Sequence, residues 1–197
     1  SPHYFYIEFL TGFIFAITYL KFPFLQFPDI APYIYFNGKE LLLFLNYLIM
    51  EIFLILIFFY DLLYKEIPDI FSLPPMIFAV MNGLFFNMPG IREMIIGGAS
   101  AGVFFQGQVI LSRGKWIGDG DVRLGILMGI MLGWKLLIVA LFTAYLLGAI
   151  ISFYLLITKK ANMKSTIAFG PYLVSGTFAA LFIGNLVIKW YTDLLFI

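Results

Sequence analysis

The sequence predicts an all-α protein, a polytopic bundle of transmembrane helices, and three features of its composition lead to this fold class. Hydrophobic residues make up 62% of the 197 positions, charged residues make up only 12%, and the mean hydropathy is +1.00. A soluble globular domain carries about 25% charged residues. The apolar residues also gather in runs close to the roughly 20 residues that a membrane-spanning helix needs.

About seven runs are apolar enough to be predicted as spans, and together they predict one membrane-embedded domain over residues 1–197. The fifth run is short and rich in glycine, whereas the sixth and seventh are clearly apolar. The predicted spans are 5–20, 41–60, 70–88, 92–111, 121–134, 136–158 and 169–189. Residues 22–39, between the first two spans, are rich in proline and aromatic side chains, which suits a loop at the membrane interface.

The basic residues predict how the spans are oriented. Seven of the 12 Lys and Arg residues fall on one predicted side and five on the other. The first side also holds two basic runs, Arg-Gly-Lys at 113–115 and Lys-Lys-Ala-Asn-Met-Lys at 159–164. Cytoplasmic loops of membrane proteins are enriched in Lys and Arg. We therefore expect a multi-pass chain whose N-terminus is cytoplasmic.

The residues that are missing or rare exclude several classes of site. There is no cysteine, which excludes disulfides, thiolate nucleophiles and thiolate metal ligands. The one histidine is His3, so we expect no His-based triad and no metal site. The formal net charge of +1 predicts no nucleic-acid partner. Because the chain begins at Ser1 without an initiator Met or a signal-peptide pattern, we expect an N-terminal part to precede it.

Two aspartates fall at the ends of different predicted spans and on the same predicted side. Asp61 follows the span 41–60, and Asp121 opens the span 121–134. Two carboxylates can hydrolyse a peptide when one, ionised, takes a proton from water and the other, protonated, polarises the scissile carbonyl. Like charges a few Å apart cannot both ionise cheaply, so such a pair shares one proton.

Glycines on either side of Asp121 favour close contacts around it. Gly118 and Gly120 leave the backbone before it unobstructed, so that a peptide strand can approach. After it, a glycine at every fourth position forms a stripe that a neighbouring helix can approach closely. This stripe consists of Gly125, Gly129 and Gly133. We expect its partner to be the face of the second span that carries Met50, Leu54 and Ile57.

Taken alone, these features leave a second interpretation open. An aspartate at a helix start is more often an N-cap than a catalyst. Glycine stripes in membrane helices usually serve packing alone, and the fourth span carries another small-residue pair, Gly98 and Gly102, that predicts a close contact. The position of both carboxylates in apolar spans favours a functional site.

Four segments, in order along the chain, resemble the motifs of the type IV prepilin peptidase family. They resemble the family's E-L-L-T-G, D-x6-P-D, G-x-G-D-V/F-K-L and P-F-G-P-F/Y-L segments. The corresponding segments here are Glu8-Phe-Leu-Thr-Gly12, Asp61-Leu-Leu-Tyr-Lys-Glu-Ile-Pro-Asp69, Gly118-Asp-Gly-Asp-Val-Arg-Leu124 and Phe169-Gly-Pro-Tyr-Leu173.

The resemblance implies a GxGD-type membrane aspartic protease in which Asp61 and Asp121 are the catalytic pair. It implies that the enzyme cleaves the short basic leader from type IV prepilins or pseudopilins, at the cytoplasmic face of the bacterial cytoplasmic (inner) membrane. The implied partners are that substrate and membrane lipid. No cofactor is expected for the proteolysis.

The chain departs from the family pattern at three places. Arg123 stands where the family has lysine, and Ala168 stands where it has proline. The family's cytoplasmic zinc domain carries two C-x-x-C pairs, and this chain has no cysteine. Bifunctional members also methylate the new N-terminus with S-adenosylmethionine. We expect that cofactor to matter only if the full-length protein has methyltransferase activity.

Three acidic residues outside the pair have interpretations of their own. We expect Asp119 to be solvated and Asp69 to be the N-cap of the next helix, with substrate binding by Asp69 or Arg123 as an alternative. Glu51 falls near the middle of the second span, where an unpaired carboxylate is costly. We expect it to be hydrogen-bonded, and the candidate partners are Ser100, Gln106 and Thr143.

Two other functions fit part of the pattern. The presenilin and signal-peptide-peptidase group also pairs Tyr-Asp, here Tyr60-Asp61, with a G-x-G-D segment, but it requires a Pro-Ala-Leu segment that this sequence lacks. A membrane transporter with a glycine-broken fifth helix is the alternative outside the proteases. It predicts coupled charges near the membrane midplane, where only Glu51 falls.

Overall fold

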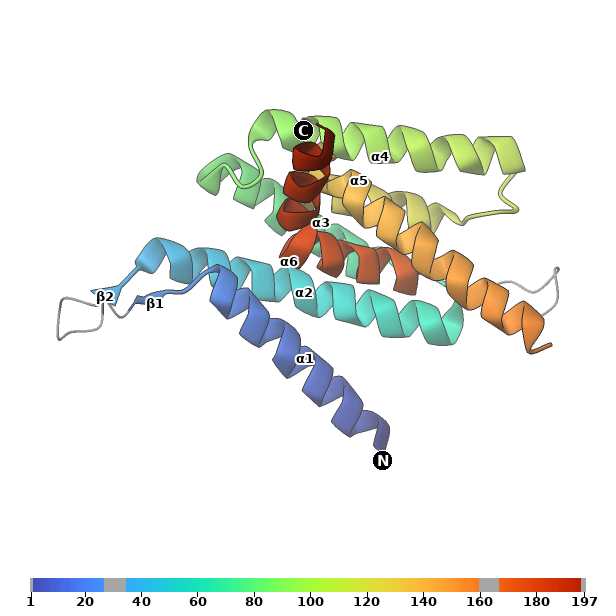
Figure 1. Cartoon of the computed structure of the whole chain (residues 1–197), viewed down its shortest axis with the longest axis horizontal. Helices are drawn as coiled ribbons and strands as arrows, with labels where there is room; N and C mark the ends of the chain where they lie inside the picture. The colour runs from blue at the N-terminus through green and yellow to red at the C-terminus, as the bar shows by residue number, and fades with distance from the viewer. Residues whose placement is uncertain (1, 27–34, 160–166, 196–197) are drawn as a thin grey trace. The chain divides into compact units, whose positions relative to one another are not determined.

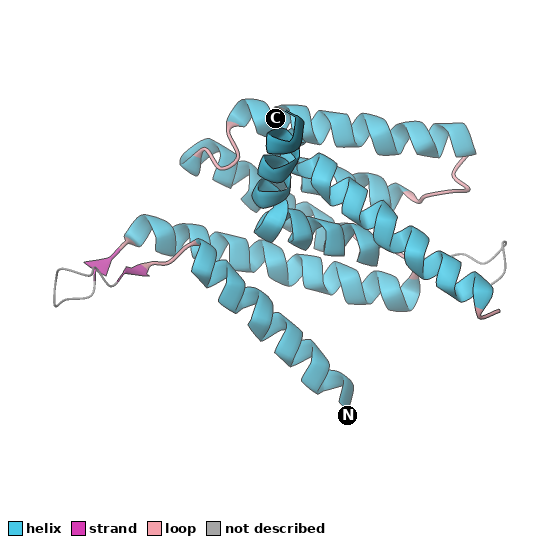
Figure 2. Ribbon diagram, viewed as in Figure 1, coloured by secondary structure: helices cyan, strands magenta, loops and turns pink. Residues whose placement is uncertain are grey.

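The structure is a computed structural model that describes residues 2–26, 35–159 and 167–195. Residues 27–34 of the predicted interface loop and residues 160–164 of the second basic run lie outside the described residues. The described part of the chain is mostly helical (Figures 1 and 2). Its α-helices are α1 (Pro2–Lys21), α2 (Gly38–Tyr64), α3 (Asp69–Met81), α4 (Ile91–Ser112), α5 (Asp119–Ile157) and α6 (Gly170–Leu195).

Two short elements complete the described chain. A π-helical turn, η1 (Asn82–Phe86), continues directly from α3. The strands β1 (Leu25–Gln26) and β2 (Tyr35–Phe36) pair antiparallel, with Leu25 opposite Phe36. The predicted all-α class is therefore confirmed apart from this one small ladder.

Five helical segments in the described residues are long and apolar enough to cross a membrane. They are residues 38–64, 69–86, 91–112, 119–157 and 170–195. A multi-pass helical membrane bundle is thus confirmed, but the count of seven spans is not. The predicted first span does form α1, although Glu8 and Lys21 lower its hydropathy, and the predicted fifth and sixth spans both lie within α5.

Helix α5 contains a break in its backbone at Gly133. This residue has φ 73° and ψ 166°, a non-helical conformation that side chains other than that of glycine rarely tolerate. A straight helix of 39 residues would be about 58 Å long, which is about twice the thickness of the hydrocarbon core. The break divides α5 where the sequence predicts the boundary between the spans 121–134 and 136–158.

The chain forms two compact units, Ser1–Ile52 and Phe53–Ile197. In the first unit, aromatic rings surround the strand pair: the centroid of Phe24 lies 5.2 Å from that of Tyr19 and 5.4 Å from that of Phe44. These contacts tie the end of α1 to the start of α2. In the second unit, α5 is the central element and packs against α3, α4 and α6 (Figure 1).

Glu51 lies in the first unit, and its predicted partners are wrong. The residue is fully buried, Thr18 Oγ1 donates a hydrogen bond to its Oε1, and Lys21 lies within electrostatic range. The predicted partners all belong to the second unit; they are Ser100, Gln106 and Thr143. The prediction failed because it searched the other spans by depth, whereas the partners of Glu51 come from the last turns of α1.

The glycine stripe of α5 faces α4, so the predicted partner, the second span with Met50, Leu54 and Ile57, is wrong. A Cβ at Gly129 would collide with the backbone of Gly97 and Gly98. A Cβ at Gly125 would collide with the ring of Phe105. Helical spacing predicts that a face is closely packed, but it does not say which helix packs against it.

The small residues of α4 contact the same helix, as their spacing predicts. A Cβ added to Gly98 would lie 2.9 Å from Cγ1 of Ile130, and one added to Gly102 would lie 3.4 Å from Cγ1 of Ile126. The close contact predicted for the fourth span is therefore confirmed. Together with the stripe, it fixes the N-terminal half of α5 against α4 immediately below Asp121.

Candidate active site

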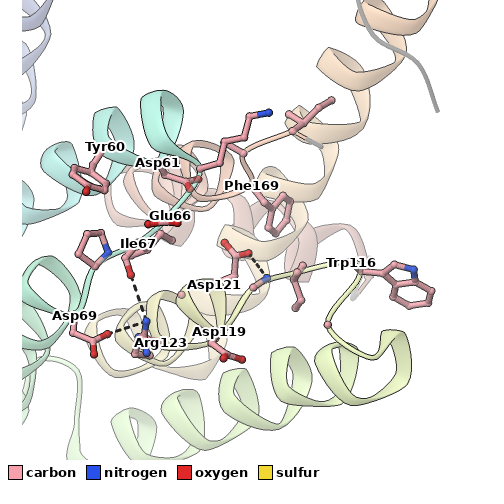
Figure 3. A pocket seen from close by; sticks show the side chains of 18 of the residues that line it. Tyr60, Asp61, Glu66, Ile67, Asp69, Trp116, Asp119, Asp121, Arg123 and Phe169 are labelled. Carbon is pink, nitrogen blue, oxygen red and sulfur yellow. Dashed lines mark hydrogen bonds and ion pairs between the residues drawn. The ribbon is translucent and has the colours of Figure 1, made fainter. Parts of the chain in front are cut away.

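A cavity of about 840 Å³ lies in the second unit, between the C-terminal end of α2, the N-terminal ends of α3 and α5, and the segment that precedes α6 (Figure 3). The chain leaves α2 at Lys65, which has a φ of 57° and whose N–H donates to the carbonyl of Asp61 (2.8 Å). The segment 65–69 then lines the cavity and leads into α3. Three helix ends, those of α2, α3 and α5, and three connecting segments, 65–68, 114–118 and 167–169, therefore supply its walls.

Asp61 belongs to the last turn of α2 and is only 4% exposed. Its Oδ2 accepts a hydrogen bond from the main-chain N–H of Gly170, the first residue of α6 (2.8 Å). N–H groups of a first helical turn have no partner within the helix, and the helix dipole favours negative charge there. The carboxylate is thus held by the end of a helix that is distant in the sequence.

Asp121 is the third residue of α5 and lies close to the helix start. Its Oδ2 accepts a hydrogen bond from the N–H of Gly118 (3.2 Å), while its own N–H donates to the carbonyl of Gly118 (3.1 Å). This reciprocal pair resembles a capping box, in which the side chain three residues into a helix folds back onto the N-cap backbone. The carboxylate therefore contributes to the helix start and lines the cavity as well.

Asp61 and Asp121 line the same cavity and lie within electrostatic range of each other. Figure 3 shows them side by side near its centre, with one side chain coming from α2 and the other from α5. Two neighbouring carboxylates titrate as a coupled pair, so that one can carry a proton while the other is ionised. The arrangement can therefore supply an acid and a base to one substrate group.

Arg123 connects α5 to the segment that precedes α3. Its Nη2 forms an ion pair with Oδ1 of Asp69 (2.8 Å) and donates to the carbonyl of Ile67 (3.4 Å). Asp69 is the first residue of α3 rather than its N-cap, which is Pro68. The predicted capping role of Asp69 is therefore wrong, because its side chain pairs with Arg123.

The side chain of Ile67 is buried and packs between the first residues of α5 and α6. A Cβ at Gly120 would lie 2.9 Å from Cβ of Ile67, and a Cβ at Gly170 would lie 3.1 Å from its Cδ1. Gly120 is thus needed to admit Ile67, not to leave room for a peptide strand as predicted. A Cβ at Gly118 would meet no atom within 4 Å, so this glycine does leave open space beside Asp121.

The remaining predicted residues line the cavity, as does Ile67, whereas Gly170 reaches the site through its hydrogen bond to Asp61. Asp119 is exposed and lines the cavity, as do Lys65 and Glu66. Sequence reasoning did not identify Ile67 or Gly170 as parts of the site. The Phe169-Gly-Pro-Tyr-Leu173 segment was the only signal for Gly170, and it gave no role because the contact is made by the main chain.

The described residues also bear on metal binding. Within residues 2–26, 35–159 and 167–195, no three His, Cys, Asp or Glu side chains are placed to hold a metal ion together. The polar contacts of the two aspartates are made by main-chain N–H groups.

Comparison with known proteins identifies related sequences. Residues 48–153 match the model of the type IV leader peptidase family. The chain is 31% identical over 147 residues to a prepilin leader peptidase/N-methyltransferase of Aeromonas salmonicida, covering 70% of this chain and 49% of the relative. It is 29% identical over 94 residues to the protein of that name from Bacillus subtilis, covering 48% of this chain and 38% of the relative.

The coverage of these relatives is partial. A third, from Pseudomonas aeruginosa, is 24% identical over 133 residues, which are 65% of this chain and 46% of the relative. This chain thus spans about half the length, or less, of the curated relatives it matches. No solved structure gives a significant match.

Proposed function

Because this chain belongs to the type IV leader peptidase family, we propose that it is an aspartic endopeptidase. Its substrates would be type IV prepilins or pseudopilins, from which it removes a short basic leader. The observation that carries this proposal is the meeting of Asp61 and Asp121 in one cavity, within electrostatic range of each other. Both segments that contain these aspartates resemble motifs of that family.

The proposed reaction uses the pair as one acid and one base. The ionised carboxylate removes a proton from a water molecule as the water oxygen attacks the carbonyl carbon of the scissile peptide. The protonated carboxyl polarises the carbonyl oxygen by a hydrogen bond, and a tetrahedral intermediate forms. A proton then passes to the peptide nitrogen, the C–N bond breaks, and the pair returns to its singly protonated state. Proteolysis by this route requires no cofactor.

The proposed location is the bacterial cytoplasmic (inner) membrane, with the N-terminus and the catalytic cavity on the cytoplasmic side. The support for this orientation is the distribution of basic residues; Lys65, Lys115 and Arg123 all line the cavity. Cytoplasmic segments of membrane proteins are enriched in such residues. A cavity at this surface can reach a bond just outside the lipid while the apolar helix of the substrate remains in the membrane.

The acidic wall of the cavity supports a basic leader as substrate. Five acidic and three basic residues line it, and the acidic ones are Asp61, Glu66, Asp69, Asp119 and Asp121. Exposed charges contribute little each, so the preference for basic leaders would come from several of them together. We assign Arg123 and Asp69 to holding the segment 65–69, with contact to the leader as a further role.

N-methylation is a separate activity that the names of the relatives include. We propose it only for the full-length protein, and it would use S-adenosylmethionine. Incubation of the cleaved product with labelled S-adenosylmethionine would detect methyl transfer to the new N-terminus. Its absence would leave the peptidase proposal intact, because proteolysis and methylation are different reactions.

The proposed peptidase activity is tested by removing each carboxyl group separately. Asp61→Asn and Asp121→Asn keep the shape of the side chain but cannot exchange the proton, so each should lower cleavage at least about 100-fold. The assay is full-length protein in detergent with a prepilin substrate, and loss of the leader is measured on a gel. Asp119→Asn, which changes an exposed neighbour on the same wall, is the control and should retain most activity. Substantial cleavage by either dyad variant would refute the mechanism.

A further inference from the structure

A second hollow, of about 350 Å³, adjoins the catalytic cavity in the second unit. Its walls come from the ends of α4, α5 and α6 and from the segments before α5 and α6. Four residues line both hollows, so the two share a wall; they are Trp116, Ile117, Ile167 and Phe169. Its volume lies at the lower end of the range for ligand pockets, about 300–1,000 Å³.

Aromatic rings dominate the wall of this second hollow. The ring centroid of Phe169 lies 5.0 Å from that of Tyr145 and 6.3 Å from that of Tyr172. A Cβ at Gly148 would lie 3.4 Å from Tyr172 and 3.6 Å from Phe169, so the two rings rest on a helix surface without a side chain. The Tyr145 hydroxyl donates a hydrogen bond to Oε1 of Gln108 (3.0 Å). Two of the few polar groups in this wall are therefore already bonded to each other.

The second hollow is also adjacent to the proposed catalytic pair. Tyr145 lies within electrostatic range of Asp121, and it lines the hollow. Figure 3 shows Phe169 and Trp116 on one side of Asp121, with Glu66 and Asp69 on the other. The pair therefore lies between a wall rich in charged residues and a wall rich in aromatic residues.

We propose that this hollow, the aromatic subsite, binds the apolar side chain directly C-terminal to the scissile bond. The inference rests on the proposed function, because it takes the substrate to be a chain with a basic leader followed by an apolar helix. The charged wall then faces the leader, and the aromatic wall faces the first residue of the apolar segment. A peptide bond at a boundary between basic and apolar sequence fits both walls at once.

The aromatic subsite gives a quantitative expectation for specificity. Differences of one or a few methylene groups in a hydrophobic pocket change kcat/KM by about 10–200-fold. A large apolar residue after the cut should therefore be preferred over alanine by about that factor. This preference for a large residue over alanine should fall when the subsite is filled, and it should not change with the charge of the leader.

The test compares two variants of neighbouring residues in α5 on two substrates. Ala149 lines the subsite, so that Ala149→Phe would fill it. Ile150 is 56% exposed and is not part of this wall, and Ile150→Phe is the matched control. The substrates are a prepilin with phenylalanine after the cut and the same prepilin with alanine there. The measurement is kcat/KM for the full-length protein in detergent.

The expected result is a change in the ratio of kcat/KM for the phenylalanine substrate to kcat/KM for the alanine substrate. Ala149→Phe should lower the preference for phenylalanine over alanine at least tenfold, whereas Ile150→Phe should leave it unchanged. An unchanged preference in Ala149→Phe, or an equal loss in both variants, would overturn the subsite. Failure of the unsubstituted protein to cleave either prepilin would instead overturn the proposed function.

Cross-linking decides the location of the subsite even for a protein that does not cleave. The substrate carries p-benzoylphenylalanine directly after the leader and is bound to the Asp121→Asn protein. Cross-links to residues 145–152 or 167–172, identified by mass spectrometry, support the aromatic subsite. Cross-links elsewhere, or none, overturn it.

Discussion

At the scale of single residues, the fit between Asp61 and Gly170 depends on position 170 having no side chain. A Cβ added there would lie 2.6 Å from Oδ2 of Asp61 and 3.0 Å from its Cγ. The same Cβ would lie 3.1 Å from Ile67, so the helix start is closely packed on that side as well. An alanine would keep the main-chain N–H, so that substitution changes the position of the carboxylate and not its donor.

Gly170→Ala is therefore expected to lower kcat for prepilin cleavage by at least about tenfold, because a displaced carboxylate loses its alignment with the reacting groups. KM should change less than kcat, since the charged and aromatic walls are untouched. The matched control is Gly107→Ala, where the added Cβ meets no atom within 4 Å. A wild-type kcat in Gly170→Ala would contradict the fit described for this pair.

The sequence revealed side chains of the site but not its main-chain contacts. Asp61 and Asp121 could be selected because aspartates at the ends of apolar spans are rare and both fell on one predicted side. Gly170 could not be selected in this way, since its contribution is an N–H that every residue except proline possesses. The capping role predicted for Asp69 failed because a nearby guanidinium, that of Arg123, attracts the carboxylate more strongly than a helix N-terminus does.

At the scale of elements, the contact between α4 and α5 supports the start of α5, where Asp121 lies. Gly129→Leu should force the two helices apart, because even a Cβ there collides with the backbone of Gly97. Overpacking of this kind typically costs about 1–3 kcal/mol, so the Tm and the prepilin cleavage rate should both fall. Gly107→Leu, on an open face of α4, should change neither. Normal Tm and activity in Gly129→Leu would contradict the role of the stripe.

The elements themselves were predictable, but their partners were not. Apolar runs identified each helix, and the glycine-rich end of the span 121–134 marked the break later found at Gly133. The partner of the stripe and the partner of Glu51 were both wrong, because periodicity describes one helix at a time. Pairing depends on how the helices cross, and a single sequence contains no direct record of it.

At the scale of the whole molecule, the chain divides into two units, and the proposed catalytic cavity belongs entirely to the second. Most of the family match, residues 48–153, falls in that unit as well. We propose that the two units nevertheless work as one membrane-embedded domain, as the sequence predicts. Within the first unit, the buried hydrogen bond between Thr18 and Glu51 joins α1 to α2.

The orientation of the chain can be tested at the two ends of α4, since these 197 residues contain no cysteine that would also be labelled. Arg92 and Arg113 flank this helix and are both exposed. In intact cells, a membrane-impermeant maleimide should label Arg92→Cys but not Arg113→Cys. After permeabilisation it should label both. The opposite pattern would reverse the proposed topology and place the catalytic cavity outside the cytoplasm.

The hydrogen bond between Gly170 and Asp61 has a consequence for how this site can evolve. At the start of α6, the N–H groups of Tyr172 and Leu173 donate to the carbonyl of Phe169 (3.0 and 3.2 Å), and Pro171 has no N–H. The N–H of Gly170 donates its hydrogen bond to Asp61, which lies 109 residues earlier in the chain. Many enzymes gain stability when a catalytic side chain is lost. Here a mutation to alanine at position 61 would also leave the N–H of Gly170 without its acceptor, so folding and the proposed catalysis would both select for the same carboxylate.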